Sequence, residues 1–140
     1  MTVSVPDLPT GQDVLDAARR LHGHVLRTPV LRNDALDEVA GAKLWFKCEN
    51  LQVTGSFKIR GATNRLLQLD PEAREKGVVA FSSGNHAQGV ARAARNCRMP
   101  ALIVMPSDAP SIKVEGVRRD GADIRFYDRT SESREEIAAE

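Results

Sequence analysis

The first third of the chain carries short blocks of helical and extended pattern, separated by polar residues and glycines. Apolar residues recur at helical spacing after Thr10, a favoured capping residue, and a second short helix is expected between Asn33 and Gly41. The segment around Pro29 should be extended, because the residue before a proline avoids the helical region. Residues 43–48 combine aromatic and apolar side chains in a way that predicts a strand.

From Ser56 onward the pattern becomes a regular alternation of helical stretches and apolar runs. Ser56 is placed to cap a helix over residues 57–69, and Asp70 should open a short helical turn. The strands expected next are residues 78–81, 101–105 and 123–127, and the helices are residues 86–97, 111–119 with Ser111 as cap, and a last helix opening at Ser131. The first strand is apolar throughout, so we expect it to be buried on both faces. This alternation predicts an α/β fold with a parallel sheet and right-handed crossovers.

Composition narrows the class of protein further. The chain has 140 residues, a formal net charge of +1 and 41% hydrophobic residues, which is typical of a globular domain and offers no basic footprint for nucleic acid or an anionic membrane. No apolar run approaches the ~20 residues that cross a bilayer, and the first seven residues carry no signal-peptide pattern. Cys48 and Cys97 lie far apart, so we expect two buried thiols in a cytoplasmic protein.

Lys58 is the first candidate for chemistry. It falls in the first turn of an expected helix, where the helix dipole disfavours a cation. If Phe57 and Ile59 also bury it, its amine is held toward the neutral, nucleophilic form. The alternative interpretation is a solvated surface lysine, since lysine is seldom buried.

The second candidate is the polar segment between the strand at residues 78–81 and the helix that follows. Ligands of open α/β sheets bind at the carboxyl ends of strands, and a helix start offers free N–H groups to a carboxylate or phosphate. A simple capping turn is the alternative. A serine hydrolase is disfavoured because the G-x-S-x-G elbow is absent, and no metal site is expected because the histidines and cysteines lack ligand spacing.

Two segments together resemble the fold-type II pyridoxal-phosphate enzymes, in the branch of the threonine/serine dehydratases and serine racemases. The first reads KCENLQVTGSFKIRGA over residues 47–62, and the second reads SSGNHAQGVA over residues 82–91. Residues 28–31 and 104–113 fit as well, so the resemblance covers nearly the whole chain after Leu8. The cysteine synthases fit less well, because their motifs differ around the lysine and after the asparagine.

The resemblance implies a fold, a cofactor and an assembly. The expected fold is a three-layer α/β arrangement with a parallel sheet and flanking helices, tryptophan-synthase-β-like and incomplete here. Residues 1–75 would belong to the larger cofactor domain, with the Schiff-base lysine, and residues 76–140 to a smaller α/β domain that is incomplete at its C-terminus. Pyridoxal 5'-phosphate is the implied cofactor, and a homo-oligomer (dimer or tetramer) is implied for a full-length protein.

The resemblance also implies roles for single residues. Lys58 would form the Schiff base with the cofactor, Phe57 would lie beside its ring, and Asn85 would bind the ring hydroxyl. Ser83 would act with Lys58 as a catalytic residue, from the opposite ring face. The substrate carboxylate would be received by Ser82, Ser83, Asn85 and His86.

The expected reaction is β-elimination of water and ammonia from L-threonine or L-serine, giving a 2-oxo acid, with a small hydroxy amino acid as substrate. Serine racemase and hydroxyaspartate dehydratase share these residues and stay open as alternatives. A non-catalytic, truncated α/β module is an alternative of another class. It is supported by a departure from the family: none of the 10 glycines is adjacent to another, whereas the family holds the cofactor phosphate with adjacent glycines.

Overall fold

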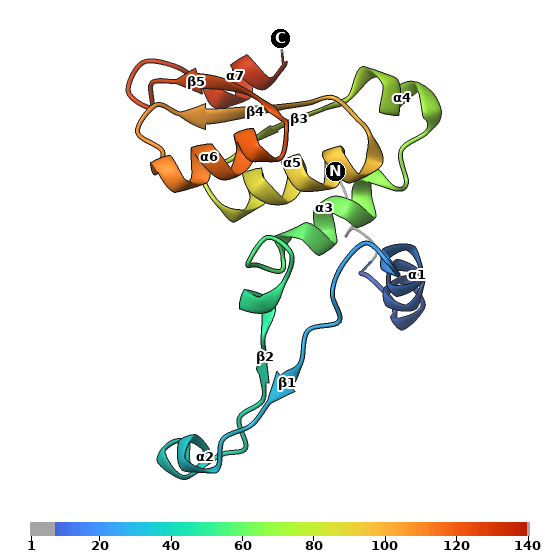
Figure 1. The fold of residues 1–140 in the computed structure, drawn as a ribbon, viewed down its shortest axis with the longest axis vertical. Helices are drawn as coiled ribbons and strands as arrows, with labels where there is room; N and C mark the ends of the chain where they lie inside the picture. Colours follow the sequence, from blue (N-terminus) through green and yellow to red (C-terminus); the bar gives the residue numbers. More distant parts are fainter. Residues whose placement is uncertain (1–7, 140) are drawn as a thin grey trace, which may run out of the picture.

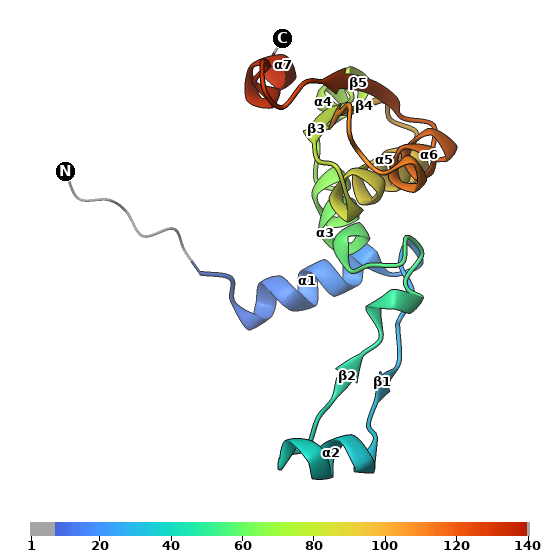
Figure 2. The same cartoon turned by 90° about the vertical axis from the view of Figure 1, so that its left-hand side faces the viewer.

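The structure is a computed structural model that describes residues 8–139, so the first seven residues and their predicted lack of a signal peptide lie outside the described part. Figures 1 and 2 show a layered unit at one end and a long projection at the other. The elements in order are α1 (Gly11–Leu21), β1 (Val30–Leu31), α2 (Asp34–Ala40), β2 (Phe46–Lys47), the 3-10 turn η1 (Glu49–Leu51), α3 (Lys58–Leu66), α4 (Pro71–Lys76), β3 (Val78–Phe81), α5 (Asn85–Cys97), β4 (Ala101–Pro106), α6 (Ser111–Arg119), β5 (Asp123–Tyr127) and α7 (Arg134–Ala139).

The last three strands form a parallel sheet in the order β3-β4-β5, with Val78 opposite Ala101 and Leu102 opposite Asp123. Helices α5 and α6 cover one face of this sheet, and α7 lies on the other face (Figure 2). The predicted three-layer α/β fold with a parallel sheet is confirmed. The proposed division of the chain between residues 75 and 76 stays a prediction.

The core lies between the sheet and α5. Ile103 and Met105 of β4 point into it and are fully buried, together with Ala87 and Ala93 of α5. Small side chains on α5 allow α3 to pack closely on its other side, where Ile59 is also fully buried. This sandwich of α3, α5 and the sheet fixes the positions of both candidate segments relative to each other.

One turn at the edge of this core requires a glycine. Gly77 has a φ of +86° and joins α4 to β3 directly against Pro100, the residue that precedes β4. A methyl group at Gly77 would lie 2.6 Å from the Pro100 carbonyl oxygen, too close for any other residue. The same carbonyl accepts a 3.0 Å hydrogen bond from Val78 N and starts the β3–β4 pairing.

Residues 29–48 form a projection that we call the arm. Its two short strands pair antiparallel, with Val30 opposite Lys47, and α2 lies at their far end (Figure 1). The predicted start and end of α2 are confirmed: Asn33 Oδ1 accepts from Leu36 N at 3.1 Å, and Gly41 is left-handed. No residue of the arm is buried, and Trp45 is 66% exposed.

Several predicted helix starts were wrong. Helix α3 begins at Lys58 and ends at Leu66. The Ser56 hydroxyl does not cap it: the hydroxyl is buried and has no hydrogen-bond partner among residues 8–139. Pro110 takes the capping position of α6, so Ser111 already lies inside the first turn. The last helix begins at Arg134 and not near Ser131, because Ser133 Oγ accepts from Glu136 N at 3.2 Å.

Two strand predictions also need correction. Strand β2 covers only Phe46–Lys47 of the predicted residues 43–48, because its partner β1 is just as short. Strand β3 is not buried on both faces: Val79 and Phe81 are 50% and 41% exposed, because β3 is an edge strand that α7 covers only in part. The cysteines are free as expected, but both are half-buried and not buried.

Candidate active site

Lys58 is the first residue of α3, and its backbone lies against α5. A methyl group at Gly89 would come within 3.1 Å of the Lys58 carbonyl carbon and 3.2 Å of Ile59 N. Only a glycine leaves room for this approach without a shift of one helix. The crossing of α3 and α5 therefore brings together the two segments that the sequence singled out, residues 54–62 and 82–89.

The segment that leads into Lys58 is held by a network of charged side chains. Arg60 donates two hydrogen bonds to the carboxylate of Glu49, at 2.9 and 2.7 Å, and Thr28 Oγ1 donates a third at 2.6 Å. The guanidinium of Arg60 lowers the pKa of Glu49 to about 2. Burial of the carboxylate opposes this shift, but the paired hydrogen bonds outweigh it.

Gln52 ties the same segment to the backbone of Leu26. The Gln52 side chain accepts from Leu26 N at 2.9 Å and donates to Leu26 O at 2.9 Å, as a neighbouring strand would. Arg60 Nη2 adds a 2.9 Å bond to the same carbonyl. The sequence reasoning did not single out Gln52, Glu49 or Arg60. Their place within the lysine-bearing motif was the signal that could have identified them as supports of Lys58.

Of the two interpretations left open for Lys58, the solvated surface lysine is the one that fits the chain described here. Its side chain is exposed, with Nζ 5.0 Å from the centre of the Phe57 ring. Of the two apolar neighbours, Ile59 is fully buried but Phe57 is 58% exposed. Ile59 lies in the core cluster, so Phe57 is the apolar neighbour that lies beside the amine. Within residues 8–139 Lys58 makes no ion pair, so its amine is available to a carbonyl ligand.

The polar segment after β3 forms a tight turn into α5. Ser82 N continues the sheet pairing to Val104 O at 3.1 Å, and Ser82 Oγ accepts from Gly84 N at 3.3 Å. Helix α5 begins at Asn85, and in the described part of the chain no side chain caps its first N–H groups. Ser83 is half-buried, whereas Asn85 is exposed at the mouth of the turn.

The side chains of this turn diverge. Asn85 lies on the α6 side, where its Oδ1 accepts a 2.6 Å hydrogen bond from Lys113 Nζ. His86 lies on the β3 side and lines a hollow of about 440 Å³ together with Ala62 and Val79. His86 was expected to help receive a carboxylate, but its side chain is turned toward the sheet edge, away from Asn85. Lys113 was part of the recognised sequence pattern, but its contact with Asn85 was not predicted.

The first turns of α3, α5 and α6 carry no acidic residue. Three helix starts and two lysines therefore make this end of the described chain electropositive. An exposed primary amine at Lys58, a ring at Phe57 and a donor amide at Asn85 fit a ligand with an aldehyde, an aromatic ring and anionic oxygens. Among residues 8–139, no group of three His, Cys, Asp or Glu side chains could hold a metal ion.

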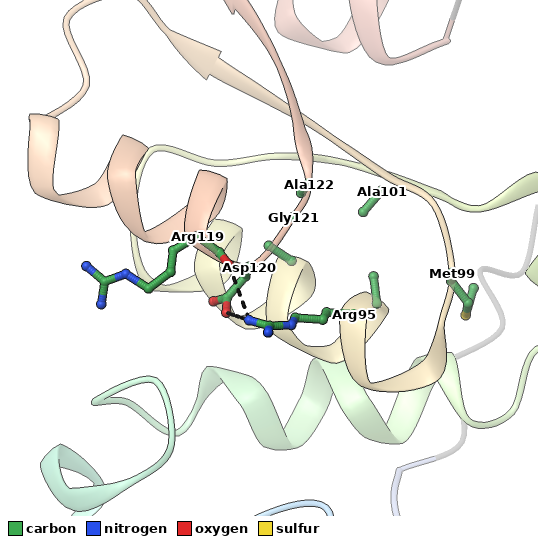
Figure 3. Close-up of a pocket in the computed structure, with 9 residues that line it drawn as sticks. Arg95, Met99, Ala101, Arg119, Asp120, Gly121 and Ala122 are labelled. Carbon is green, nitrogen blue, oxygen red and sulfur yellow. Dashed lines mark hydrogen bonds and ion pairs between the residues drawn. The ribbon is translucent and has the colours of Figure 1, made fainter.

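A second hollow, of about 330 Å³, lies at the opposite ends of α5 and α6 (Figure 3). Its charged groups already bind one another: Arg95 reaches Asp120 at 3.7 Å and donates to Arg119 O at 3.2 Å. None of the residues predicted for the site lines this hollow. The contacts in this hollow therefore hold α5 and α6 together, and the candidate active site lies at the other end of these helices.

The chain matches the family model described as "Pyridoxal-phosphate dependent enzyme" over residues 21–140. It belongs to this family, whose members depend on pyridoxal phosphate, and the predicted resemblance is confirmed. One relative is the L-threo-3-hydroxyaspartate ammonia-lyase of a Pseudomonas species, 57% identical over 130 residues that cover 93% of this chain and 41% of the relative.

Solved structures of fold-type II enzymes superpose on the chain. A maize serine racemase gives a TM-score of 0.86 at 47% identity, over 90% of this chain and 38% of that protein. A threonine deaminase of T.th. gives 0.80 at 45% identity, over 94% of this chain and 41% of that protein. The chain thus spans about two fifths of the length of the relatives it matches. No helix within residues 8–139 is long and apolar enough to cross a membrane.

Proposed function

We propose that this chain supplies the lysine-bearing part of a pyridoxal-phosphate enzyme that eliminates water and ammonia from a 3-hydroxy amino acid. The observation that carries the proposal is the packing of Gly89 against the Lys58 backbone, which joins an available amine to a turn rich in hydrogen-bond donors. Among hydroxy amino acids we favour hydroxyaspartate over the initially expected threonine or serine. The Pseudomonas hydroxyaspartate enzyme is 57% identical to this chain, against 45% for the threonine deaminase.

Charge gives a physical reason for the same preference. Hydroxyaspartate carries a second carboxylate, which threonine and serine lack. The candidate site combines helix starts without acidic residues with Lys113, which is half-buried beside the turn. Such a field favours a dicarboxylate over a substrate with a single carboxylate.

The resemblance suggests a role for each residue of the candidate site, and we propose the same roles here. Lys58 would bind the cofactor and then, as a free amine, remove the Cα proton, while the cofactor supplies an electron sink for the charge left behind. The Cβ hydroxyl would leave as water with the proton that Lys58 took from Cα, and one water molecule would then hydrolyse the product to a 2-oxo acid and ammonia. Ser82, Ser83, Asn85 and His86 would orient the carboxylate next to the reacting carbon. His86 would need to turn from the β3 side to take part.

Serine racemase is the second candidate function, because the maize serine racemase superposes with a TM-score of 0.86. In that reaction Ser83 would return a proton to the face opposite Lys58, and no bond at Cβ would break.

The proposal also includes the compartment and the assembly: a cytoplasmic, homo-oligomeric protein. The free state of Cys48 and Cys97 supports a reducing compartment.

A titration of the 140-residue chain with pyridoxal phosphate tests the proposal. We expect a saturable visible absorbance band that is lost in Lys58→Ala and kept in Lys76→Ala. Lys76 is a matched control, because it is an exposed lysine on α4 whose ion-pair partner is Glu72. No band beyond that of Lys58→Ala would show that this chain alone is the non-catalytic module.

The substrate is tested by measuring 2-oxo acid and ammonia from L-threo-3-hydroxyaspartate, L-threonine and L-serine. We expect the highest kcat/KM for hydroxyaspartate. A higher value for threonine or serine would restore the first expectation. Formation of D-serine from L-serine without 2-oxo acid would assign the racemase reaction instead.

A further inference from the structure

Helices α5 and α6 run side by side in a fixed register. Near their ends, Arg92 Nε donates to the buried carboxylate of Asp120. One turn nearer the candidate site, Gly116 lies against Gln88, where a methyl group would come within 3.0 Å of Gln88 Nε2. The partners of both contacts are 28 residues apart in the sequence, as expected for parallel helices of successive βαβ units.

The next contact along this register is the hydrogen bond from Lys113 Nζ to Asn85 Oδ1, at 2.6 Å. It again joins residues 28 positions apart. The contact therefore continues a packed series whose other end is anchored by a carboxylate that is 1% exposed. Lys113 is half-buried, and its ammonium group reaches the exposed side chain of Asn85.

The chemistry of the two groups settles which way the Asn85 amide faces. A lysine ammonium has three donors and no acceptor, so the amide must turn its oxygen toward Lys113. Its Nδ2 hydrogens then point to the other side. An amide fixed in this way turns its two N–H donors toward a ligand on that side.

We propose that Lys113 is a positioning residue that holds Asn85 as a donor to the anionic ring oxygen of the cofactor. The inference rests on the proposed function, since the resemblance gives Asn85 the ring oxygen as its partner. Lys113 contributes in two ways: it fixes the orientation of the amide, and it adds a positive charge behind it. Both favour an anionic oxygen over a neutral hydroxyl.

The test compares Lys113→Met, which keeps most of the length of the side chain but removes its charge and donors, with Lys113→Arg, which keeps charge and donors. The apparent Kd of pyridoxal phosphate should rise about 5- to 30-fold in Lys113→Met, as expected for the loss of a charge-assisted hydrogen bond. Lys113→Arg should restore most of the affinity. The control Lys76→Met should leave the Kd unchanged, because Lys76 pairs with Glu72 on α4.

If Lys113 had a purely structural role, Lys113→Met would lower the affinity for every cofactor analogue equally. The titration is therefore repeated with 3-deoxypyridoxal 5'-phosphate, which lacks the ring oxygen. We expect Lys113→Met to have little effect on this analogue. An equal loss for both cofactors would overturn the proposal.

Side-chain amide NMR of the ¹⁵N-labelled chain separates this proposal from the proposed function. The two Nδ2 proton resonances of Asn85 should shift in Lys113→Met and stay in place in Lys76→Met. If the wild-type chain gives no absorbance band, the proposed function fails for this chain, and the NMR result alone decides whether Lys113 orients Asn85. Unshifted Asn85 resonances would refute the inference whether or not cofactor binds.

Discussion

The arm (residues 29–48) and the layered unit that follows β3 (residues 78–139, here called the body) are ordered by different forces. The body buries apolar side chains on both sides of α5, with Ile103 and Val117 fully inaccessible. The arm buries none of its residues and leaves Val39 87% exposed. Polar bonds from Thr28, Glu49 and Lys47 hold the base of the arm instead.

This difference has a consequence for Lys58, which lies between the two regions. Its backbone is fixed on the body side by Gly89, and the segment before it is fixed on the arm side by Glu49 and Arg60. Changes to the body should alter overall stability, whereas changes to the network should loosen the arm and leave the sheet intact. Trp45, the single tryptophan, lies on the arm and reports on that region alone.

The largest effect is expected from Ile103→Ala in the centre of β4. The side chain is 0% exposed within the core, so its loss should lower the free energy of unfolding by ~2–5 kcal/mol. Urea unfolding followed by circular dichroism measures the change. Val79→Ala is the control, since Val79 is 50% exposed on the same sheet and should cost less than ~1 kcal/mol. Equal losses for both variants would refute the picture of a body held by its core.

A smaller effect is expected from Gly89→Ala, at the contact between α3 and α5. The added methyl group would lie 3.1–3.3 Å from Lys58 atoms and would force the helices apart, at a cost of ~1–3 kcal/mol. Gly61→Ala is the matched control, because nothing lies within 4 Å of its new methyl group and alanine favours a helix. Cofactor absorbance should fall in Gly89→Ala and be kept in Gly61→Ala. The opposite ranking would show that this contact does not position Lys58.

The smallest effect is expected from acid acting on the arm. Because the pKa of Glu49 is lowered from 4.5 to about 2, its contribution is complete above pH 4.5 and is lost as the pH falls toward 2. Trp45 fluorescence should change in this range before circular dichroism does. Asp37, whose pKa is also lowered by Arg32, contributes to the same transition.

Glu49→Gln isolates the part played by Glu49 in this acid transition. The variant should weaken the arm by ~1–2 kcal/mol at neutral pH, because it loses charge-assisted hydrogen bonds. Its Trp45 transition should be smaller than that of the wild-type chain. A transition of the same size in both proteins would mean that Glu49 does not hold the arm.

The body could be predicted from the sequence because each of its elements follows a clear local rule. Apolar runs next to glycine or proline predicted β3 and β4, residues 123–127 after Gly121 predicted β5, and the alanine-rich stretch predicted α5. Helix starts were harder, because several residues near each start could serve as a cap. Pro110 and Ser133 took positions that the pattern had given to Ser111 and Ser131.

The site was predicted less completely, because its geometry depends on contacts between distant segments. The sequence identified Lys58 and the turn at residues 82–86, but it could not show that Lys58 is exposed within this chain. The contact of Lys113 with Asn85 follows from the register of α5 and α6, which no local pattern reveals. The hydrogen bond from Arg60 to Glu49 likewise forms only once the loop between them has folded.

The position of β3 bears on how the isolated chain behaves in concentrated solution. Its four residues, Val78–Phe81, carry no charge, and its outer edge has no neighbouring strand within residues 8–139. The other edge strand, β5, is protected by Asp123 and Arg125, which disfavour pairing with another molecule. Copies of the chain should therefore associate through β3 as the concentration rises.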